Sequence, residues 1–162
     1  MIEISKSAKV SQHADIEDSV RGSRIIIDDE VIIDAFVKIK PAGGMGDVKI
    51  GKNSVINSGC VLYTGNGIIL GEGVAIAANC TLAPTNHEFA KSDIPIRKQG
   101  FKPSRGGIVV GNDVWIGANC VVLDGAIIPN GCVIGAGSVV LGKLEPYSVY
   151  AGNPLRMIRK RK

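Results

Sequence analysis

The sequence predicts an all-β solenoid, a coil of short parallel strands, and two observations carry this prediction. Between residues 110 and 144 an aliphatic residue recurs at every sixth position, at Val110, Ile116, Val122, Ile128, Ile134 and Val140. An α-helix does not repeat every six residues, whereas a solenoid in which strands and corners alternate does. The chain also has 21 glycines but only three Phe, three Tyr and one Trp among its 162 residues. Its core must therefore consist of Ile, Val and Leu, with glycine at many corners.

Each six-residue unit supplies one strand and one corner, so three units close one triangular turn. The same frame continues from residue 110 back toward the start of the chain, although it is weaker before residue 50. We expect about six turns in a single domain over residues 1–162, with small loops at some corners, such as residues 43–47. The turns are expected to begin at Val10, Ile27, Ile50, Leu70, Val110 and Ile128.

The fourth position of each unit explains the corners. From residue 50 onward, ten of the twelve units carry Gly, Asn or Asp at this position. These residues adopt a left-handed backbone at the least cost, which is what a tight corner requires. The two exceptions are Thr85 and Lys143, and both lie where the pattern is about to break.

The fifth position of each unit holds a small or aliphatic residue that should point into the core. All four cysteines occupy this position, namely Cys60, Cys80, Cys120 and Cys132. Because the chain has no CxxC motif and no Cys–His spacing typical of zinc sites, we interpret them as reduced core residues. Cys60, Cys80 and Cys120 should stack about 4.8 Å apart on neighbouring turns.

One interruption of the pattern is large, because 40 residues separate the turn starts at Leu70 and Val110. Residues 88–107 therefore form an excursion from the solenoid. They include Phe89, Ile94, Pro95, Ile96, Phe101 and Pro103. This is more apolar surface than a solvated loop carries, so the excursion should pack on another subunit or cover a ligand, a flexible loop being the alternative. Residues 155–162 follow Pro154 and are expected to form a short basic helix.

The chain has two histidines in different settings. His13 falls at a corner of the first turn, where His tolerates a positive φ, and we interpret it as structural or solvated. His87 ends the last unit before the excursion, at the mouth of the only long loop. A histidine in such a place is exposed enough to react and shielded enough to be tuned, which makes His87 a candidate general base.

Specific motifs surround His87 and continue toward the C-terminus. They are NHEF at residues 86–89, DIPI at 93–96, VGNDVWIGAN at 110–119, IGAGSVV at 134–140 and YAGNP at 150–154. With the period of six they resemble the hexapeptide-repeat acyltransferases, and most closely the sugar O-acetyltransferases of the galactoside, maltose and surface-polysaccharide types. The resemblance runs from Ile50 to Arg159. It implies a left-handed parallel β-helix and a homotrimer with each active site in a cleft between two subunits.

The resemblance implies roles for individual residues. His87 matches the family's general base, which takes the proton from an acceptor hydroxyl as its oxygen attacks the acetyl-CoA thioester, without an acyl-enzyme. Its orienting partner stays open between a backbone carbonyl, Glu88 and Asp93. Ala118 and Ala136 match positions whose backbone groups hold the pantetheine arm of CoA, and an amide there would stabilise an oxyanion. Small residues that merely fit a corner are the alternative interpretation.

Three basic residues and the single tryptophan complete the implied CoA site. Trp115 matches a tryptophan beside the CoA cleft, although it would equally fit the seam of a trimer. Arg156 and Arg159 match basic positions near the CoA phosphates, a solvated tail being the alternative. Relatives carry Thr-Lys-Asp after the last strand, whereas this chain has Leu-Gly-Lys at 141–143. Lys143 is thus displaced by one position, and its contact with a phosphate stays open.

Three further residues are candidates for binding the acceptor. Asn57 and Tyr63 lie one or two turns from His87, and Asn86 lies beside it. Their polar side chains would suit the hydroxyl groups of a sugar. Asn86 also falls at an inward position, where a hydrogen bond in the core is the alternative.

The leading interpretation is an acetyl-CoA-dependent O-acetyltransferase that acts on a sugar in surface-polysaccharide biosynthesis. An N-acetyltransferase of a nucleotide-linked amino sugar and a non-catalytic binding solenoid are the alternatives. A zinc carbonic anhydrase, which can have the same fold, needs three histidine ligands. This chain has only two histidines, so no metal is expected. The net charge of +4 is concentrated in the C-terminal tail, which argues against nucleic-acid binding. No apolar run approaches the ~20 residues that span a bilayer, and a cytoplasmic location is expected.

Overall fold

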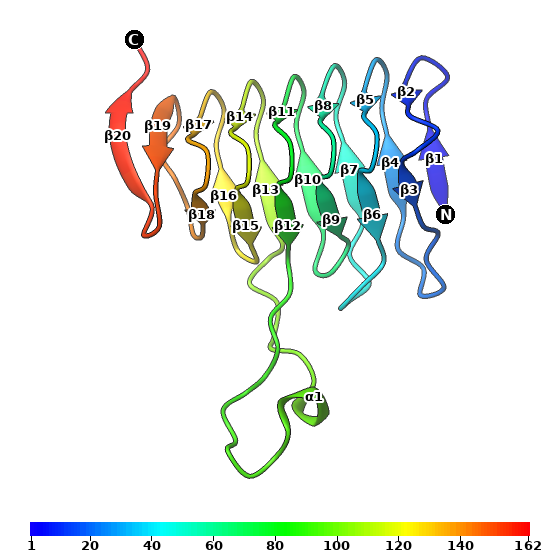
Figure 1. The fold of residues 1–162 in the computed structure, drawn as a ribbon, viewed down its shortest axis with the longest axis vertical. Coiled ribbons are helices and arrows are strands. Elements are labelled where there is room, and N and C mark those ends of the chain that lie inside the picture. The colour runs from blue at the N-terminus through cyan, green and yellow to red at the C-terminus, as the bar shows by residue number, and fades with distance from the viewer.

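The computed structural model describes residues 1–162 as a parallel β-helix with six complete turns, each of which contributes one strand to each of three sheets (Figure 1). Sheet 1 contains β1 (Ile2–Ile4), β4 (Ile25–Ile27), β7 (Val48–Ile50), β10 (Ile68–Leu70), β13 (Ile108–Val110) and β16 (Ile127–Ile128). Sheet 2 contains β2 (Lys9–Val10), β5 (Ile32–Ile33), β8 (Val55–Ile56), β11 (Ala75–Ile76), β14 (Trp115–Ile116), β17 (Val133–Ile134), β19 (Ser148–Ala151) and β20 (Arg156–Lys160). Sheet 3 contains β3 (Asp15–Ile16), β6 (Lys38–Lys40), β9 (Val61–Tyr63), β12 (Thr81–Ala83), β15 (Val121–Leu123) and β18 (Val139–Val140).

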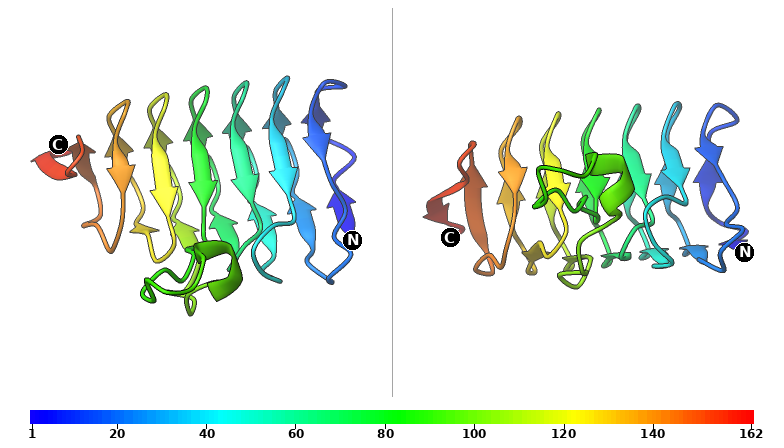
Figure 2. Two further views of the ribbon diagram at one scale, coloured as in Figure 1. Left: turned by 60° about the horizontal axis from the view of Figure 1, so that its bottom comes forward. Right: turned by 90° about the horizontal axis from the view of Figure 1, so that it is seen from below.

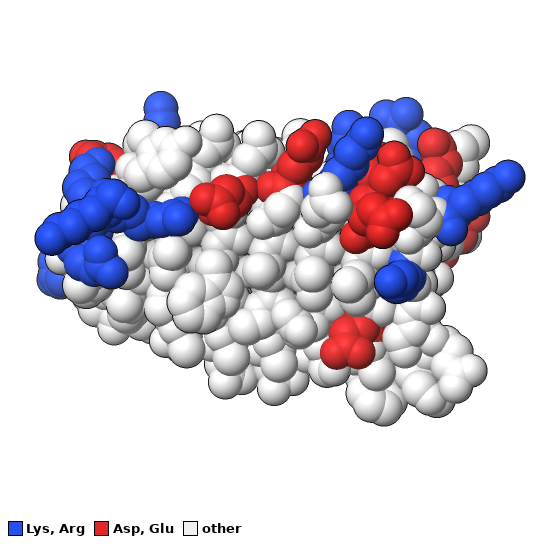
Figure 3. Space-filling view, turned by 90° about the horizontal axis from the view of Figure 1, so that it is seen from above, with Lys and Arg blue, Asp and Glu red and all other residues white.

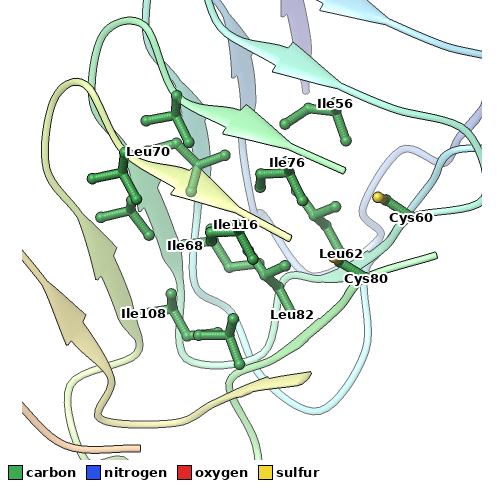
Figure 4. Packing of buried hydrophobic residues seen from close by; sticks show 14 of the residues in the cluster. Ile56, Cys60, Leu62, Ile68, Leu70, Ile76, Cys80, Leu82, Ile108 and Ile116 are labelled. Atoms are coloured by element: carbon green, nitrogen blue, oxygen red, sulfur yellow. The ribbon is translucent and has the colours of Figure 1, made fainter. Parts of the chain in front are cut away.

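The predicted all-β solenoid of about six turns is confirmed, and the arrangement is consistent with the left-handed coil that the resemblance implies. Strand register follows the six-residue frame, since Leu70 pairs with Ile50 on one side and with Val110 on the other. Residues at the same position of successive turns therefore stack along the coil. They form one core of 30 buried residues, most of them Ile, Val and Leu (Figure 4).

The corner prediction is confirmed at the level of backbone angles. All ten Gly, Asn and Asp residues at the fourth position have positive φ, between 44° at Gly65 and 87° at Gly125, whereas Thr85 and Lys143 do not. The weaker second turn has Glu30 and Phe36 at the equivalent corners, with φ of 55° and 63°. These two residues tolerate a left-handed backbone less well than Gly or Asn, which explains why the sequence pattern is weaker there.

The four cysteines are buried and free, as predicted. Cys60, Cys80 and Cys120 lie at the inner corner between sheets 2 and 3 on three successive turns. Each thiol donates to a backbone carbonyl of the next turn, over 3.0 Å from Cys60 to Ala77, 3.1 Å from Cys80 to Gly117 and 3.2 Å from Cys120 to Gly135. Contact with Cys80 and burial raise the pKa of the Cys120 thiol, which keeps it protonated.

The first turn begins earlier than predicted. The expected start is Val10, but β1 precedes it and pairs with β4 in register. Ile4 stands six residues before Val10 and so belongs to the same frame. His13 lies at a corner of this turn without a positive φ. It is exposed, and its ring stacks on Phe36 with centroids 5.8 Å apart.

The excursion leaves sheet 3 after β12 and rejoins sheet 1 at β13. It projects from the corner between these sheets and carries the helix α1 (Ile96–Gln99), which the sequence did not predict (Figures 1 and 2). Phe89, Ile96 and Phe101 remain 59%, 55% and 51% exposed. The expectation that the excursion covers a ligand or another subunit therefore stays a prediction, with apolar side chains available for either role.

The predicted C-terminal helix at residues 155–162 is wrong. This segment forms β20, which pairs antiparallel with β19 at the end of sheet 2. Without β20, the outer edge of β19 would be unpaired, and the pairing satisfies its backbone groups. Pro154 lies in the turn between the two strands rather than in the first turn of a helix.

Candidate active site

His87 stands at the base of the excursion, where its two legs meet. The N–H of Glu88 donates to the carbonyl of Gly100 over 2.9 Å, and the N–H of Lys102 donates to the carbonyl of Asn86 over 2.8 Å. Between these bonds His87 and Phe101 form an antiparallel bridge. Their rings lie in contact, with centroids 4.8 Å apart and planes tilted by 35°. The exposed imidazole is thus held by a short ladder and by one aromatic neighbour.

A shallow pocket of about 250 Å³ opens beside this imidazole. It is lined by Ala42, Gly43, Tyr63, Ala83, Thr85, His87 and Phe101. The lining contains no Lys, Arg, Asp or Glu, and its polar side chains are those of Tyr63, Thr85 and His87. The hydroxyl groups of Tyr63 and Thr85 form no hydrogen bond within the chain. The pocket therefore offers free hydroxyl groups and an imidazole between apolar and aromatic walls.

The ring nitrogens of His87 form no hydrogen bond within the chain. Of the three predicted orienting partners, Glu88 is occupied elsewhere, since its carboxylate accepts the N–H groups of Phe89 and Ala90 at 2.8 and 2.9 Å. These bonds, the one from Ala90 first, lower the pKa of Glu88. Asp93 is exposed and has no hydrogen-bonded partner. Within one chain, the ring contact with Phe101 is the side-chain interaction that orients the imidazole of His87.

Of the three predicted acceptor-binding residues, only Tyr63 lines the same pocket as His87. Asn57 lies at the far edge of sheet 3, where its amide donates to the carbonyl of Ile76 over 2.7 Å. Asn86 adjoins His87 but does not line the pocket, and its side chain makes no core hydrogen bond.

Sequence reasoning did not assign Ala42, Gly43, Ala83, Thr85 and Phe101 to the site. The sequence contains a departure from the repeat pattern at two of these residues, Thr85 and Gly43. Thr85 is an exception to the corner rule, and Gly43 begins a small interruption at the preceding corner.

Three of the predicted CoA-binding residues, Trp115, Ala118 and Ala136, lie on other surfaces of the coil than His87. Trp115 is on the outer face of sheet 2 and is 55% exposed. Ala118 and Ala136 occupy the corner between sheets 2 and 3 on neighbouring turns, where the N–H of Gly137 donates to the carbonyl of Ala118 over 2.8 Å. His87 is at the corner between sheets 3 and 1. A single chain therefore separates the candidate base from these residues by the width of sheet 3.

The charge distribution distinguishes two regions of the surface. In the part of sheet 2 formed by β8, β11, β14 and β17, and in the corners that follow these strands, no Lys, Arg, Asp or Glu occurs. Figure 3 shows a broad uncharged area below a row of charged side chains, with basic residues gathered at the C-terminal end. Trp115, Ala118 and Ala136 belong to the uncharged region.

The basic residues at the C-terminal end are not equivalent. Lys160 pairs with Glu145 at 2.6 Å and Arg161 pairs with Asp113 at 3.0 Å. Arg156 and Arg159, the two predicted phosphate ligands, form no ion pair, so their guanidinium groups are available to an anion. Lys143 is exposed and forms a backbone bridge with Ile127 at the corner between sheets 3 and 1.

No group of three or more His, Cys, Asp and Glu side chains is arranged to hold a metal ion. The structure also contains no helix whose length and apolar character would let it cross a bilayer.

The chain has relatives among known transferases. Residues 107–142 match the family described as bacterial transferase hexapeptide (six repeats). The galactoside O-acetyltransferase of Escherichia coli K12 is 37% identical over 114 residues, which cover 70% of this chain and 54% of that protein. The putative lipopolysaccharide biosynthesis O-acetyl transferase WbbJ of the same strain is 32% identical over 124 residues, 74% of this chain and 63% of that protein. The chain thus spans somewhat over half the length of these two relatives.

Among solved structures, a mutant of AntD, an N-acyltransferase from Bacillus cereus, superposes with a TM-score of 0.82 at 27% identity. The match covers 99% of this chain and 84% of AntD, which was in complex with dTDP-4-amino-4,6-dideoxyglucose and coenzyme A. Repeat period, corner geometry, sequence relatives and structural neighbours agree. The chain belongs to the hexapeptide-repeat family of bacterial transferases.

Proposed function

We propose that this chain is an acetyl-CoA-dependent O-acetyltransferase that acetylates a sugar hydroxyl, with His87 as the general base. The observation that carries the proposal is the pocket in which the imidazole of His87 faces free hydroxyl groups and aromatic walls. Aromatic faces and neutral hydrogen-bonding groups suit a sugar ring. The galactoside and lipopolysaccharide O-acetyltransferases that the chain resembles support this acceptor class.

The chemistry follows from the position of the base. His87 accepts the proton of the acceptor hydroxyl through a neutral ring nitrogen while the hydroxyl oxygen attacks the carbonyl carbon of the thioester. The new C–O bond replaces the C–S bond, and the sulfur leaves as the thiolate of CoA and takes up a proton. Acetyl-CoA supplies the acetyl group and the leaving group. No side chain of the protein is acetylated in this scheme.

The residues that would hold CoA fit its parts. The uncharged surface with Trp115, Ala118 and Ala136 suits the neutral pantetheine arm, and a backbone N–H near Ala118 or Ala136 would stabilise the oxyanion. The unpaired Arg156 and Arg159 suit the phosphates. Lys143 is a further candidate for a phosphate contact, since it is exposed and forms no ion pair.

We further propose a homotrimer with active sites between subunits. His87 lies at a different corner of the chain from Ala118 and Ala136, so a second copy would bring the base and these CoA-binding candidates together. The exposed Phe89, Ile96 and Phe101 give the excursion an apolar surface to place against that copy. Light scattering after size exclusion tests the trimer, and a monomer with full activity would contradict the shared site. We assign the reaction to surface-polysaccharide biosynthesis in the cytoplasm, which holds the acetyl-CoA pool.

N-acetylation of a nucleotide-linked amino sugar is the second candidate, favoured by the similarity to AntD over 99% of this chain. Turnover assays with a hydroxyl-only sugar and with a nucleotide-linked amino sugar distinguish O-acetylation from N-acetylation. The released CoA thiol measures the rate in both assays. His87→Ala should lower the rate by ~10²–10⁴-fold, the usual contribution of a general base, while calorimetry shows unchanged binding of CoA. An undiminished rate would reject His87 as the base. If CoA does not bind the wild-type protein, a non-catalytic solenoid is the better description.

A further inference from the structure

Asp124 is a buried carboxylate that the proposed chemistry does not use. It is 2% exposed, at the corner between sheets 3 and 1 that follows β15. Its Oδ1 accepts the N–H of Gly107 over 2.9 Å, and its Oδ2 accepts the N–H of Arg105 over 2.8 Å. Oδ2 also accepts the amide of Asn66 over 3.2 Å. No Lys or Arg pairs with it, so these three neutral donors offset the cost of burying the charge.

Two of these donors belong to the return leg of the excursion. Arg105 and Gly107 immediately precede β13, where the chain rejoins the solenoid. The leg is tightly seated, because a Cβ on Gly107 would lie 2.5 Å from the carbonyl oxygen of Gly67. Asn66 comes from that same neighbouring corner. Asp124 therefore connects the return leg with the corners on either side of it, which follow β9 and β15.

The far end of the return leg is the part that touches His87. Phe101, whose ring packs on the imidazole, is separated from Arg105 by only Lys102, Pro103 and Ser104. Pro103 has a fixed φ and restricts the residue before it, which makes this link short and stiff. This short link joins the hydrogen-bonded Arg105 to the Phe101 ring that contacts His87.

We propose that Asp124 is a positioning residue for His87: by holding Arg105 and Gly107 it keeps Phe101 packed on the imidazole. This inference rests on the proposed role of His87 as the general base. When a general base is displaced from its ideal position, the reaction slows without a matching loss of substrate binding. The reason is that correct orientation of the base lowers the activation barrier.

Histidine NMR tests the positioning directly. The protons of His87 experience the ring current of Phe101, whereas His13 lies on a different turn and provides an internal reference. In Asp124→Asn one carboxylate oxygen becomes an NH₂ group that faces an N–H donor, so at least one bond to the return leg is lost. The His87 Hε1 resonance should then move toward the position it has in Phe101→Leu, and the His13 resonance should stay.

Kinetics of the full-length protein complete the test. Asp124→Asn should lower kcat by about tenfold or more and change the KM for acetyl-CoA by less than about twofold, as expected for lost orientation. Asp29→Asn, which removes the ion pair of Asp29 with Lys52 at a remote corner, should change neither kcat nor the His87 resonance. An unchanged His87 resonance, or a moved resonance with unchanged kcat, would overturn the proposal. Full activity of His87→Ala would instead reject the general-base role, so the two failures are distinguishable.

Two variants of Arg105, which donates a backbone hydrogen bond to Asp124, test the proposal independently in case Asp124→Asn does not fold. Arg105→Pro removes the N–H that donates to Asp124, whereas Arg105→Ala keeps it, and both remove the same exposed side chain. Only Arg105→Pro should reproduce the change of the His87 resonance and the lower kcat. Equal effects of the two variants would contradict the role of the hydrogen bond.

Discussion

Tyr63 and His87 line one pocket although they come from successive turns of the coil. Tyr63 ends β9, and His87 follows β12, which pairs with β9 in register. The two side chains therefore meet because residues after adjacent parallel strands emerge at the same edge of a sheet. Tyr63 has a free hydroxyl at this edge, which makes it the best-supported ligand for an acceptor among the residues that the sequence proposed.

Replacing this hydroxyl should weaken use of the acceptor. Tyr63→Phe is expected to lower kcat/KM for the acceptor by about fivefold, since one hydrogen bond contributes about 1 kcal/mol. The KM for acetyl-CoA should not change. Initial rates at varied concentrations of each substrate give both values.

Asn57→Ala is the matched control for this experiment. It removes a hydrogen bond to Ile76 at the far edge of sheet 3 and should cost about 1 kcal/mol of folding free energy without altering acceptor kinetics. The opposite pattern, with acceptor kinetics sensitive to Asn57 and not to Tyr63, would move the acceptor site to the other corner.

Arg161 should anchor the last strand. Its guanidinium donates to Asp113 over 3.0 Å and to the carbonyl of Gly131 over 2.8 Å. Because the ion pair is partly exposed, Arg161→Ala should cost about 1 kcal/mol, mostly from the bond to the carbonyl. Urea unfolding measures the loss, and hydrogen exchange should show faster opening of β20 than of β17. Lys162→Ala, which removes a terminal charge without a partner, should leave both unchanged; an equal effect would mean that net charge is responsible.

The repeating part of this fold can be predicted from the sequence because residues at the same position of the six-residue unit have the same structural role in every turn. Ile50, Leu70 and Val110 stack on one another, and the corner residues Asn53 and Gly73 both adopt positive φ. Where an individual residue departs from its class, as Phe36 does at a corner, the signal weakens even though the backbone keeps its shape.

The parts that the sequence did not predict depend on contacts between distant segments. Residues 156–160 follow Pro154 and are rich in basic side chains, both compatible with a helix, but the open edge of β19 made a strand more favourable. The pairing of His87 with Phe101 depends on how the excursion folds back, and no local pattern in the sequence encodes it. The height of Asn57 along the coil predicts that it lies near His87, but Asn57 follows β8 and His87 follows β12, so the two residues lie at different corners.

The cysteines should be inert in the folded protein. Burial raises the pKa of the Cys132 thiol, and contact with Cys80 together with burial raises that of Cys120, so little of their thiolate is present at pH 7 to 8. Hydrogen bonding with Cys80 lowers the pKa of the Cys60 thiol, so Cys60 is protected by its complete burial instead. A thiol-reactive disulfide reagent should modify none of the four within minutes under native conditions and all four in denaturant. Rapid modification of one cysteine in the native protein would show that the coil opens at that turn.

The base of the excursion should respond to acid through Glu88. Hydrogen bonds from Ala90 and Phe89 lower the pKa of this carboxyl in the folded protein. A lowered pKa means that the carboxylate favours the folded loop above the unfolded value of about 4.3, and that this contribution is lost as the pH falls through the folded value. The amide resonances of Phe89 and Ala90 should therefore show an acid-induced shift with a midpoint below 4.3. In Glu88→Gln this acid-induced shift should be absent, while the resonance of Gly137 behaves as in the wild type. A midpoint above 4.3 would show that the carboxylate does not cap these amides in solution.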